Sequence, residues 1–256
     1  MSIRQKRIMS LGGYLQAVTQ VKTRWEQSEG AIAMTAWFRG HEDASWSLIP
    51  SIYRPEFARL PEYECRRDFR RRAYPYLLGT AREPTDDWDW YFLMQHHGLP
   101  TRLLDWSESP LVGLFFALRE KPGEKDAVVW MLDPFWLNNE VAAFGDLVLS
   151  HHDSRIAGYL PGESAAAKAT VPVAVDPPYT SRRITAQQGC FTIHGSDRRP
   201  LDSYHILRQR MFRFLVPNDR ARHVRRELRD AGFTESVMFP DLSSLCRELV
   251  DYWLEL

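Results

Sequence analysis

The sequence is poor in the features that mark secreted and membrane proteins. It has three cysteines, Cys65, Cys190 and Cys246, and their odd number and wide spacing indicate neither a disulfide framework nor a zinc site. No apolar run is as long as a membrane-spanning helix, and the N-terminal residues lack the apolar core of a signal peptide. We therefore expect a cytoplasmic protein with no membrane partner.

The formal net charge is zero, because 33 Lys and Arg residues balance 33 Asp and Glu residues. Without a global field, contact with a nucleic acid has to come from local patches of charge. The chain is instead rich in aromatic side chains, which make up 12% of its residues and favour a packed core. Its 256 residues show no internal repeat and no clear linker, so we predict a single domain over residues 1–256.

Hydrophobic periodicity and capping residues predict an α+β fold. Helices are expected at residues 10–28 (ended by Gly30), 61–78, 86–98, 110–118, 218–230 and 241–253, with a short one from 133, and strands at 31–39, 46–49, 127–132, 190–194, 206–216 and 237–239. The first two strands are expected to pair as a hairpin. From Phe144 to Thr180 the signal fades, which is typical of a long loop or lid. Because helices and strands do not alternate regularly, we predict short, mostly antiparallel strands flanked by helices.

The most informative stretch is Tyr91 to Leu118, YFLMQHHGLPTRLLDWSESPLVGLFFAL. A helix ends at Gly98, a short segment follows, and Ser107 or Ser109 can cap a second helix that is apolar on nearly all sides. The free N–H groups of such a helix start suit an anionic ligand. The alternative is that these serines are structural caps with no ligand.

Arg39 stands at the end of a predicted strand and is followed by Gly40. An arginine in this position can grip a phosphate or carboxylate, while a glycine lets the ligand approach the backbone. The alternative is an ion pair with a carboxylate such as Glu42 or Asp43.

Two further stretches carry polar groups that could bind a ligand. Gln187 and Gln188 precede a strand and can hydrogen-bond a base, a ribose or an amide, although glutamines are also common in turns. Cys190, inside that strand, is expected to be a buried core thiol. Five arginines within residues 66–72 could contact a polyanion, but a solvated helix face paired with Glu62 and Glu64 explains them as well.

Four segments together resemble the FRG domain family, named after a Phe-Arg-Gly tripeptide. They are WFRG at 37–40, QHHGLPTRLLDWSESPLVGLFFAL at 95–118, RITAQQGCFTIHG at 183–195 and TESVMFPDLSSLCREL at 234–249. The resemblance spans about residues 35–249, after the N-terminal helix at 10–28, with Gly113 where alanine is expected. It implies a bacterial or phage-associated protein, with defence or toxin roles in some members.

The order of these segments is also similar to the ADP-ribosyltransferase fold, which uses NAD as substrate. That resemblance implies that Arg39, with Gly40, holds the NAD phosphates. Ser107 and Gln188 would contact ribose, with Gln187 as the alternative to Gln188. Trp106 would stack on nicotinamide, Asp105 would supply the catalytic carboxylate, and Arg102 would complete the binding residues.

The late position of that fold usually holds glutamate, and glutamine cannot act as a base. Either Asp105 or Glu108 supplies the carboxylate, or the substrate needs little activation, or the chain binds without reacting. The leading hypothesis is an NAD-dependent ADP-ribosyltransferase acting on a protein or nucleic-acid target, with oligomeric state left open. The alternative is a non-catalytic nucleotide- or nucleic-acid-binding regulatory module. A metal-dependent hydrolase using His96, His97 and Asp105 is disfavoured, because adjacent histidines on a helix point about 100° apart.

Overall fold

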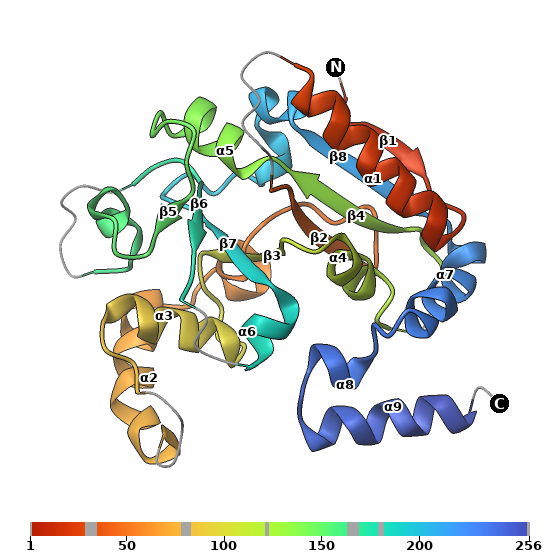
Figure 1. Ribbon diagram of the computed structural model, residues 1–256. Coiled ribbons are helices and arrows are strands. Elements are labelled where there is room, and N and C mark those ends of the chain that lie inside the picture. Colours follow the sequence, from red (N-terminus) through yellow and green to blue (C-terminus); the bar gives the residue numbers. More distant parts are fainter. Residues whose placement is uncertain are drawn as a thin grey trace.

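A computed structural model describes residues 2–28, 35–77, 83–120, 123–162, 169–178 and 182–254. Within these ranges the chain forms one open, mixed eight-stranded sheet with helices around it (Figure 1). Its strands, in spatial order, are β1 (Arg4–Arg7), β8 (Met211–Val216), β4 (Ala127–Leu132), β2 (Trp37–His41), β3 (Leu103–Ser107), β7 (Gly189–Ile193), β6 (Val173–Asp176) and β5 (Leu149–Ser150). The two edge strands pair in parallel with their neighbours, and the inner pairs are antiparallel.

The first half of the sheet, β1-β8-β4-β2, is covered on one face by α1 (Leu11–Glu26) and α4 (Pro110–Ala117). Ser10 caps α1 and Ser109 caps α4, each by accepting a hydrogen bond from a first-turn N–H. Tyr14 lies edge-on to Phe214, with their ring centroids 5.3 Å apart, and joins α1 to β8. α4 is buried on nearly every side, as its composition predicts.

Helix α4 approaches β2 so closely that two glycines are required at the crossing. A Cβ on Gly40 would lie 2.2 Å from the backbone of α4, and a Cβ on Gly113 would lie 2.8 Å from Cβ of Phe38. Alanine at position 113, which the family resemblance led us to expect, would therefore collide with β2. The space that we predicted for a ligand at Gly40 is occupied by α4.

The second half, β3-β7-β6-β5, packs against α3 (Asp87–His96) through a separate aromatic and aliphatic cluster. Phe92 of α3 stacks on Phe191 of β7 with ring centroids 5.2 Å apart. Asp86 caps α3, and Gly98, with φ of 83°, follows its C-cap, so both predicted ends of this helix are confirmed. α2 (Glu62–Leu77) extends from α3 at the edge of the molecule (Figure 1).

The opposite face of the sheet is covered mainly by short helices and loops. These include α5 (Pro134–Trp136), the π-helical turn η3 (Leu137–Val141) and the 3-10 turns η5 (Leu201–Ser203) and η6 (His205–Gln209). The 3-10 turns η1 (Ser51–Tyr53) and η2 (Pro55–Phe57) precede α2, and η4 (Ser154–Tyr159) packs into the cluster around α3. Trp37, Trp106 and Trp130 are all buried on the opposite face. Cys190 is buried here as well, and burial raises the pKa of its thiol, which confirms a core cysteine.

Several predicted elements are wrong. Residues 46–49 form no strand, because the Leu48 N–H donates to the carboxylate of Asp202 and the Leu48 carbonyl accepts from the Leu201 N–H. Strand β2 therefore pairs with β3 and β4, and the predicted hairpin is not formed. Residues 237–239 belong largely to helix α8 (Glu235–Met238), and β8 begins at Met211 after η6. Strand β1 and helix α6 (Arg182–Gln187) were not predicted at all.

Other predictions are confirmed in part. β4 has the predicted bounds, and the predicted loop region after Phe144 contains β5, η4 and β6. Gly30, the first residues of the predicted strand from 31, and parts of the predicted lid at 163–168 and 179–180 lie outside the described residues.

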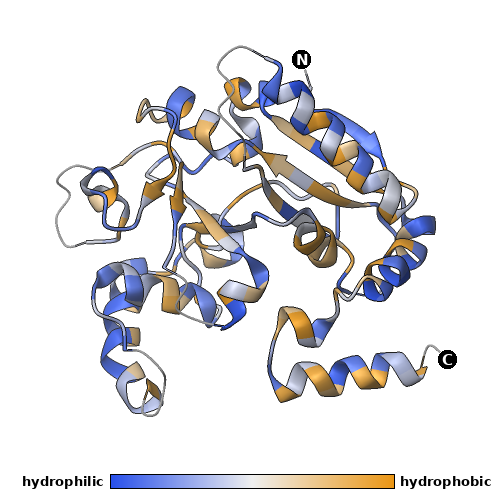
Figure 2. Cartoon of the chain, viewed as in Figure 1, coloured by the Kyte–Doolittle hydropathy of each residue, from blue (hydrophilic) through white to orange (hydrophobic). Residues whose placement is uncertain are grey.

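The C-terminal region consists of α7 (Asn218–Asp230), α8 and α9 (Leu242–Leu254). α9 contacts the molecule through polar bonds, such as the Ser236 N–H to Glu248 at 2.8 Å, and its hydrophobic residues are visible along its length in Figure 2. No described helix combines the length and apolarity needed to cross a bilayer.

Candidate functional site at the gap between β2 and β3

The two halves of the sheet meet at a single residue pair. Phe38 lies opposite Ser107, whereas β3 pairs with β7 over five positions on its other side and β2 pairs with β4 over five. Beyond Phe38 the two strands separate, and we call this opening the gap. Strands that part leave main-chain groups without ladder partners, which other groups must satisfy. Such openings in a sheet are places where ligands bind in many folds.

Arg39 fills the gap. Its Nη1 donates to the main-chain oxygen of Asp105 at 2.6 Å and lies 3.8 Å from the Asp105 carboxylate, and its Nε donates to Nε2 of His41 at 3.0 Å. About 17% of the Arg39 side chain remains exposed. Burial lowers its pKa, Asp105 raises it, and the nearby Arg54 lowers it further. Arg39 therefore joins the two halves of the sheet and keeps its guanidinium at the surface of the gap.

Two more basic side chains share this position, and we call Arg39, His41 and Arg54 the gap cluster. Burial lowers the pKa of His41 to about 3, and Arg39, Arg54 and Arg213 lower it as well. Arg54 lies in the bend between η1 and η2, and within the described ranges its side chain has no carboxylate partner. Asp105 is thus the carboxylate in ion-pair contact with the cluster, and the local charge favours a bound anion.

Asp105 is held from the other side by α3. Its Oδ2 accepts a hydrogen bond from Nε2 of Gln95 at 2.8 Å, and Oε1 of Gln95 accepts from Thr101, which is fully buried. The Asp105 side chain is 57% exposed, so it can reach a ligand while Gln95 fixes its direction. His96 lies nearby, and burial lowers its pKa to about 4, with further lowering by Arg183.

The two glutamines differ, because the side chain of Gln187 is held by the fold and that of Gln188 is available to a ligand. Gln187 donates from Nε2 to the Met238 carbonyl at 3.1 Å, and its main-chain oxygen accepts from Ser107 Oγ at 2.7 Å. Gln188 adopts φ of 44°, a left-handed conformation that is unfavourable for a residue other than glycine. Its side chain bonds no other described residue in the hydrogen bonds found, so Gln188 is the available member.

The sequence did not reveal that two carboxyl groups, those of Glu108 and Asp176, interact beside Gln188. The Glu108 N–H donates to the Gln188 carbonyl at 3.1 Å, and Asp176 lies at the end of β6. Although Asp176 is at the surface, desolvation raises its pKa to about 6 and Glu108 raises it too. Glu108 follows the end of β3, and the three residues from Asp105 to Glu108 span at most about 10 Å of extended chain. A carboxyl group that titrates near neutrality can exchange protons with a ligand.

Three predicted site residues lie elsewhere. Trp106 is on the opposite face of β3 from Asp105, 3% exposed, with its Nε1–H bonded to the buried Thr192. Arg102 is bound by Glu62, which accepts from its Nε at 2.6 Å. Ser107 is also buried, and its Oγ joins the Gln187 carbonyl to the Ser109 N–H. These residues therefore support the site without facing the gap.

The basic face of α2 is largely neutralised. Arg66 and Arg70 both bond Asp87, at 3.0 and 2.9 Å, and Arg71 and Arg72 lie 3.7 and 3.4 Å from Asp68. The arginines are therefore paired, as in the alternative that we gave to nucleic-acid contact, but their partners are Asp68 and Asp87 and not the predicted Glu62 and Glu64.

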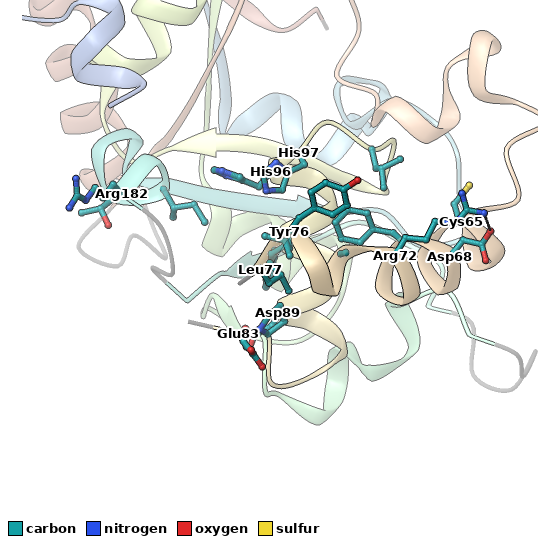
Figure 3. A pocket seen from close by; sticks show the side chains of 18 of the residues that line it. Cys65, Asp68, Arg72, Tyr76, Leu77, Glu83, Asp89, His96, His97 and Arg182 are labelled. Carbon is teal, nitrogen blue, oxygen red and sulfur yellow. Dashed lines mark hydrogen bonds and ion pairs between the residues drawn. The ribbon is translucent and has the colours of Figure 1, made fainter. Parts of the chain in front are cut away.

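A groove of about 1480 Å³ opens between α2, α3 and α6 on the other side of the Gln95 region. Figure 3 shows Arg72, Tyr76 and Leu77 of α2 along one wall, with His96 and His97 at the end of α3 facing the same space. Its lining is mainly apolar, with charged residues such as Asp68 among the side chains. Because His96 adjoins Gln95, the groove and the gap meet at the C-terminal end of α3.

A protein-family model, that of the FRG domain, matches residues 34–126. This part of the chain is therefore similar to the FRG domain. The match includes β2, β3, α3 and α4, and therefore the gap cluster and Asp105. It ends before β4, so the segments at 183–195 and 234–249, to which we extended the resemblance, lie outside it. No curated protein and no solved structure matches the chain.

Sequence reasoning missed His41, Arg54, Gln95 and Asp176 in this protein. His41 follows Gly40 directly, and its alternation with Arg39 on one face of β2 was a usable signal. Gln95 and Asp176 reach the site through the packing of α3 and β6 on β3 and β7, which no local pattern records.

Proposed function

We propose that this protein binds NAD in the gap and transfers its ADP-ribosyl group to an acceptor. The observation that carries the proposal is the gap cluster, in which Arg39 and Arg54 share one position with one carboxylate, Asp105, in contact. Guanidinium groups are suited to bidentate bonds with phosphate oxygens. A dinucleotide supplies two adjacent phosphates and, beyond them, the ribose whose glycosidic bond is to be broken.

The reaction needs few protein groups. The bond between ribose C1′ and the nicotinamide nitrogen breaks, and nicotinamide leaves with the electron pair, which neutralises its ring. The oxocarbenium-like carbon is favoured by nearby negative charge. The acceptor's nucleophile then forms a bond to C1′ and gives its proton to a carboxylate. Gln188 would hold a ribose hydroxyl without taking part in proton transfer.

Two carboxylates can take the catalytic role, and their surroundings differ. Asp105 is fixed by Gln95, and its carboxylate lies 3.8 Å from Arg39, close to where the phosphates would bind. Glu108 bonds the Gln188 carbonyl through its N–H, and its charge helps to raise the pKa of Asp176 to about 6, a value that suits proton exchange. We assign the oxocarbenium-stabilising role to Asp105, because its side chain shares the gap with the gap cluster.

The groove beside α3 offers a place for the acceptor. It is lined by apolar side chains with charged residues among them, and its edge at His96 adjoins the residue that holds Asp105. In this proposal a side chain of a protein or an exposed base of a nucleic acid would enter past His96 to reach C1′.

The test is release of nicotinamide from NAD by the purified chain, alone and with a bacterial lysate as the source of acceptor. Asp105→Asn should reduce release at least about a hundredfold, because one charge stabilising the transition state is lost. Glu108→Gln is the matched comparison that assigns the catalytic carboxylate, and Glu124→Gln, on an exposed loop, controls for the loss of one charge. Release that Asp105→Asn leaves intact but Glu108→Gln abolishes would move the role to Glu108.

The binding-module alternative predicts a different result. A nucleotide would raise the melting temperature of the protein, and no nicotinamide would appear even with lysate. The pairing of the α2 arginines with Asp68 and Asp87 weakens the nucleic-acid form of this alternative. If the chain instead binds RNA or DNA, its affinity should fall steeply with salt.

The defence or toxin setting implied by the family resemblance is an extension of the same proposal. Expression in a bacterial host should slow growth, and Asp105→Asn should restore it at equal protein level. Equal toxicity of both forms would separate any growth effect from the proposed chemistry.

A further inference from the structure

A second group of polar side chains lies at the N-terminal end of α3, away from the gap. His151 and His152 form a turn directly after β5, and Asp86 is the N-cap of α3. One ligand atom from each of Asp86, His151 and His152 can be chosen so that all three lie within 4.8 Å of one another. No step of the proposed transfer uses these residues.

The carboxylate of Asp86 has one oxygen committed and one facing the histidines. Its Oδ1 accepts the Asp89 N–H at 2.8 Å, which is the capping bond of α3. Its Oδ2 lies 3.5 Å from Nδ1 of His152. Capping thus holds the carboxylate in place while leaving the second oxygen directed at an imidazole.

The two imidazoles lie closer together than adjacent histidines on a helix do. The ring centroids of His151 and His152 are 3.8 Å apart, whereas those of His96 and His97, at the end of α3, are 5.0 Å apart and nearly perpendicular. His151 also packs edge-on to Phe92, with ring centroids 6.1 Å apart, and this contact restricts the orientation of its ring.

We propose that Asp86, His151 and His152 form a binding site for a late first-row divalent metal ion, with Zn²⁺ as the main candidate. Two imidazole nitrogens and one carboxylate oxygen suit this class of ion, and three protein ligands leave a fourth position for water. Ligands about 2.1 Å from a tetrahedral ion lie about 3.4 Å from each other. The Asp86–His152 pair has this spacing already, and the 70% exposed His152 side chain is free to rotate and complete the set.

The location of this site places a bound ion between two elements of the fold. α3 has ten residues and is about 15 Å long, and its other end holds Asp105 through Gln95. A bound ion would fasten the turn after β5 to the start of α3, which packs on β7 through Phe92. The site therefore binds metal whether or not the chain uses NAD.

The experiment is equilibrium dialysis of the untagged chain against Zn²⁺, followed by elemental analysis, with Co²⁺ as a spectroscopic probe. One Zn²⁺ per chain is expected, with visible Co²⁺ bands of four-coordinate intensity. At a hundredfold excess over Kd, the melting temperature should rise by about 5 to 10 °C. His151→Ala and His152→Ala should each weaken binding about a hundredfold or more, beyond the loss seen when outer-shell partners are removed.

Asp86→Asn keeps the α3 cap and removes the anionic ligand, so it should weaken binding about tenfold or more with little change in the metal-free melting temperature. His205→Ala removes an exposed histidine elsewhere and should change nothing. Circular dichroism of each variant shows whether it is folded. Less than one Zn²⁺ per five chains, or affinity unchanged in both His151→Ala and His152→Ala, would overturn the proposal.

Discussion

Two regions of the molecule place arginines beside carboxylates, and they do so in opposite ways. Where α2 meets α3 and β3, Glu62 bonds both Arg102 and the hydroxyl of the fully buried Tyr91, while Asp87 bonds both Arg66 and Arg70. In the gap, Arg39 bonds a main-chain oxygen at 2.6 Å and stays 3.8 Å from the Asp105 carboxylate.

The difference separates charge that supports the fold from charge that is left for a ligand. A guanidinium with close carboxylate partners has little further attraction for an anion, because its field is already offset. In the gap the nearest carboxylate, that of Asp105, stays 3.8 Å from Arg39 and is 57% exposed, so the field of the arginines is offset less. The sequence contains more arginines near α2, yet the gap is the better candidate for binding phosphate.

The largest expected effect is on stability, from Glu62→Gln. Glu62 and Arg102 are 10% and 24% exposed, so removing the acid leaves a cation that is largely buried and unpaired. We expect the free energy of unfolding to fall by about 2 to 3 kcal/mol, somewhat below the cost of breaking a fully buried pair. Urea unfolding measures this, with the exposed Glu64→Gln as the control. NAD affinity should not change, and a loss of affinity would show that the two regions are coupled.

Arg39→Gln should have the opposite effects to Glu62→Gln, with a large loss of NAD affinity and a small loss of stability. Loss of a bidentate phosphate contact should weaken NAD binding about tenfold to a hundredfold. Stability should fall by only about 1 kcal/mol, because the Asp105 carbonyl loses its donor at a position that water can reach. Calorimetric titration measures the affinity, and Arg39→Lys should recover part of it. If Arg39→Gln unfolds the protein and leaves binding intact, Arg39 belongs with the structural arginines.

The contrast also shows what the sequence could and could not predict. The ends of α3 and α4 were predictable because Asp86, Gly98 and Ser109 act within one turn of the helix they bound. The buried strand β4 was predictable because its six residues are all apolar. These are local signals, and Arg39 was found by the same kind of signal, a basic residue before a glycine.

The rest depended on contacts between distant segments. The close crossing of β2 and α4 explains Gly40 and Gly113 together, and neither residue alone indicates the other. Strand β1 is short and fully exposed, so it has no apolar pattern to detect. The gap exists because β2 and β3 share one pair, and Arg54 reaches it from a bend between two short turns.

His41 offers a pH test of the gap cluster. Its pKa in the folded protein is about 3, below the ordinary value of 6.5, so the unfolded chain binds the proton more readily between these values. His41 therefore contributes stability above pH 6.5 that is lost as the pH falls towards 3, at up to about 1.4 kcal/mol per pH unit.

Urea unfolding at pH 7 and pH 5 measures the slope, and His41→Gln should reduce it. His194, whose burial lowers its pKa to about 4, adds a similar slope and remains in both proteins. A bound phosphate should raise the pKa of His41 and flatten the slope of the native protein. If neither His41→Gln nor phosphate changes the slope, His41 does not belong to the gap cluster.

The smallest effect is expected from Asp87→Asn, which tests whether the α2 pairs merely neutralise charge. Asp87 is 50% exposed, and exposed ion pairs contribute about 0.2 to 1 kcal/mol even with two partners. The melting temperature should fall by a degree or two at low salt, and the difference should vanish at high salt because the pairs are screened. The same substitution frees Arg66 and Arg70 for polyanions, so weak nucleic-acid binding that appears only in Asp87→Asn would show that pairing is what keeps α2 from such contacts.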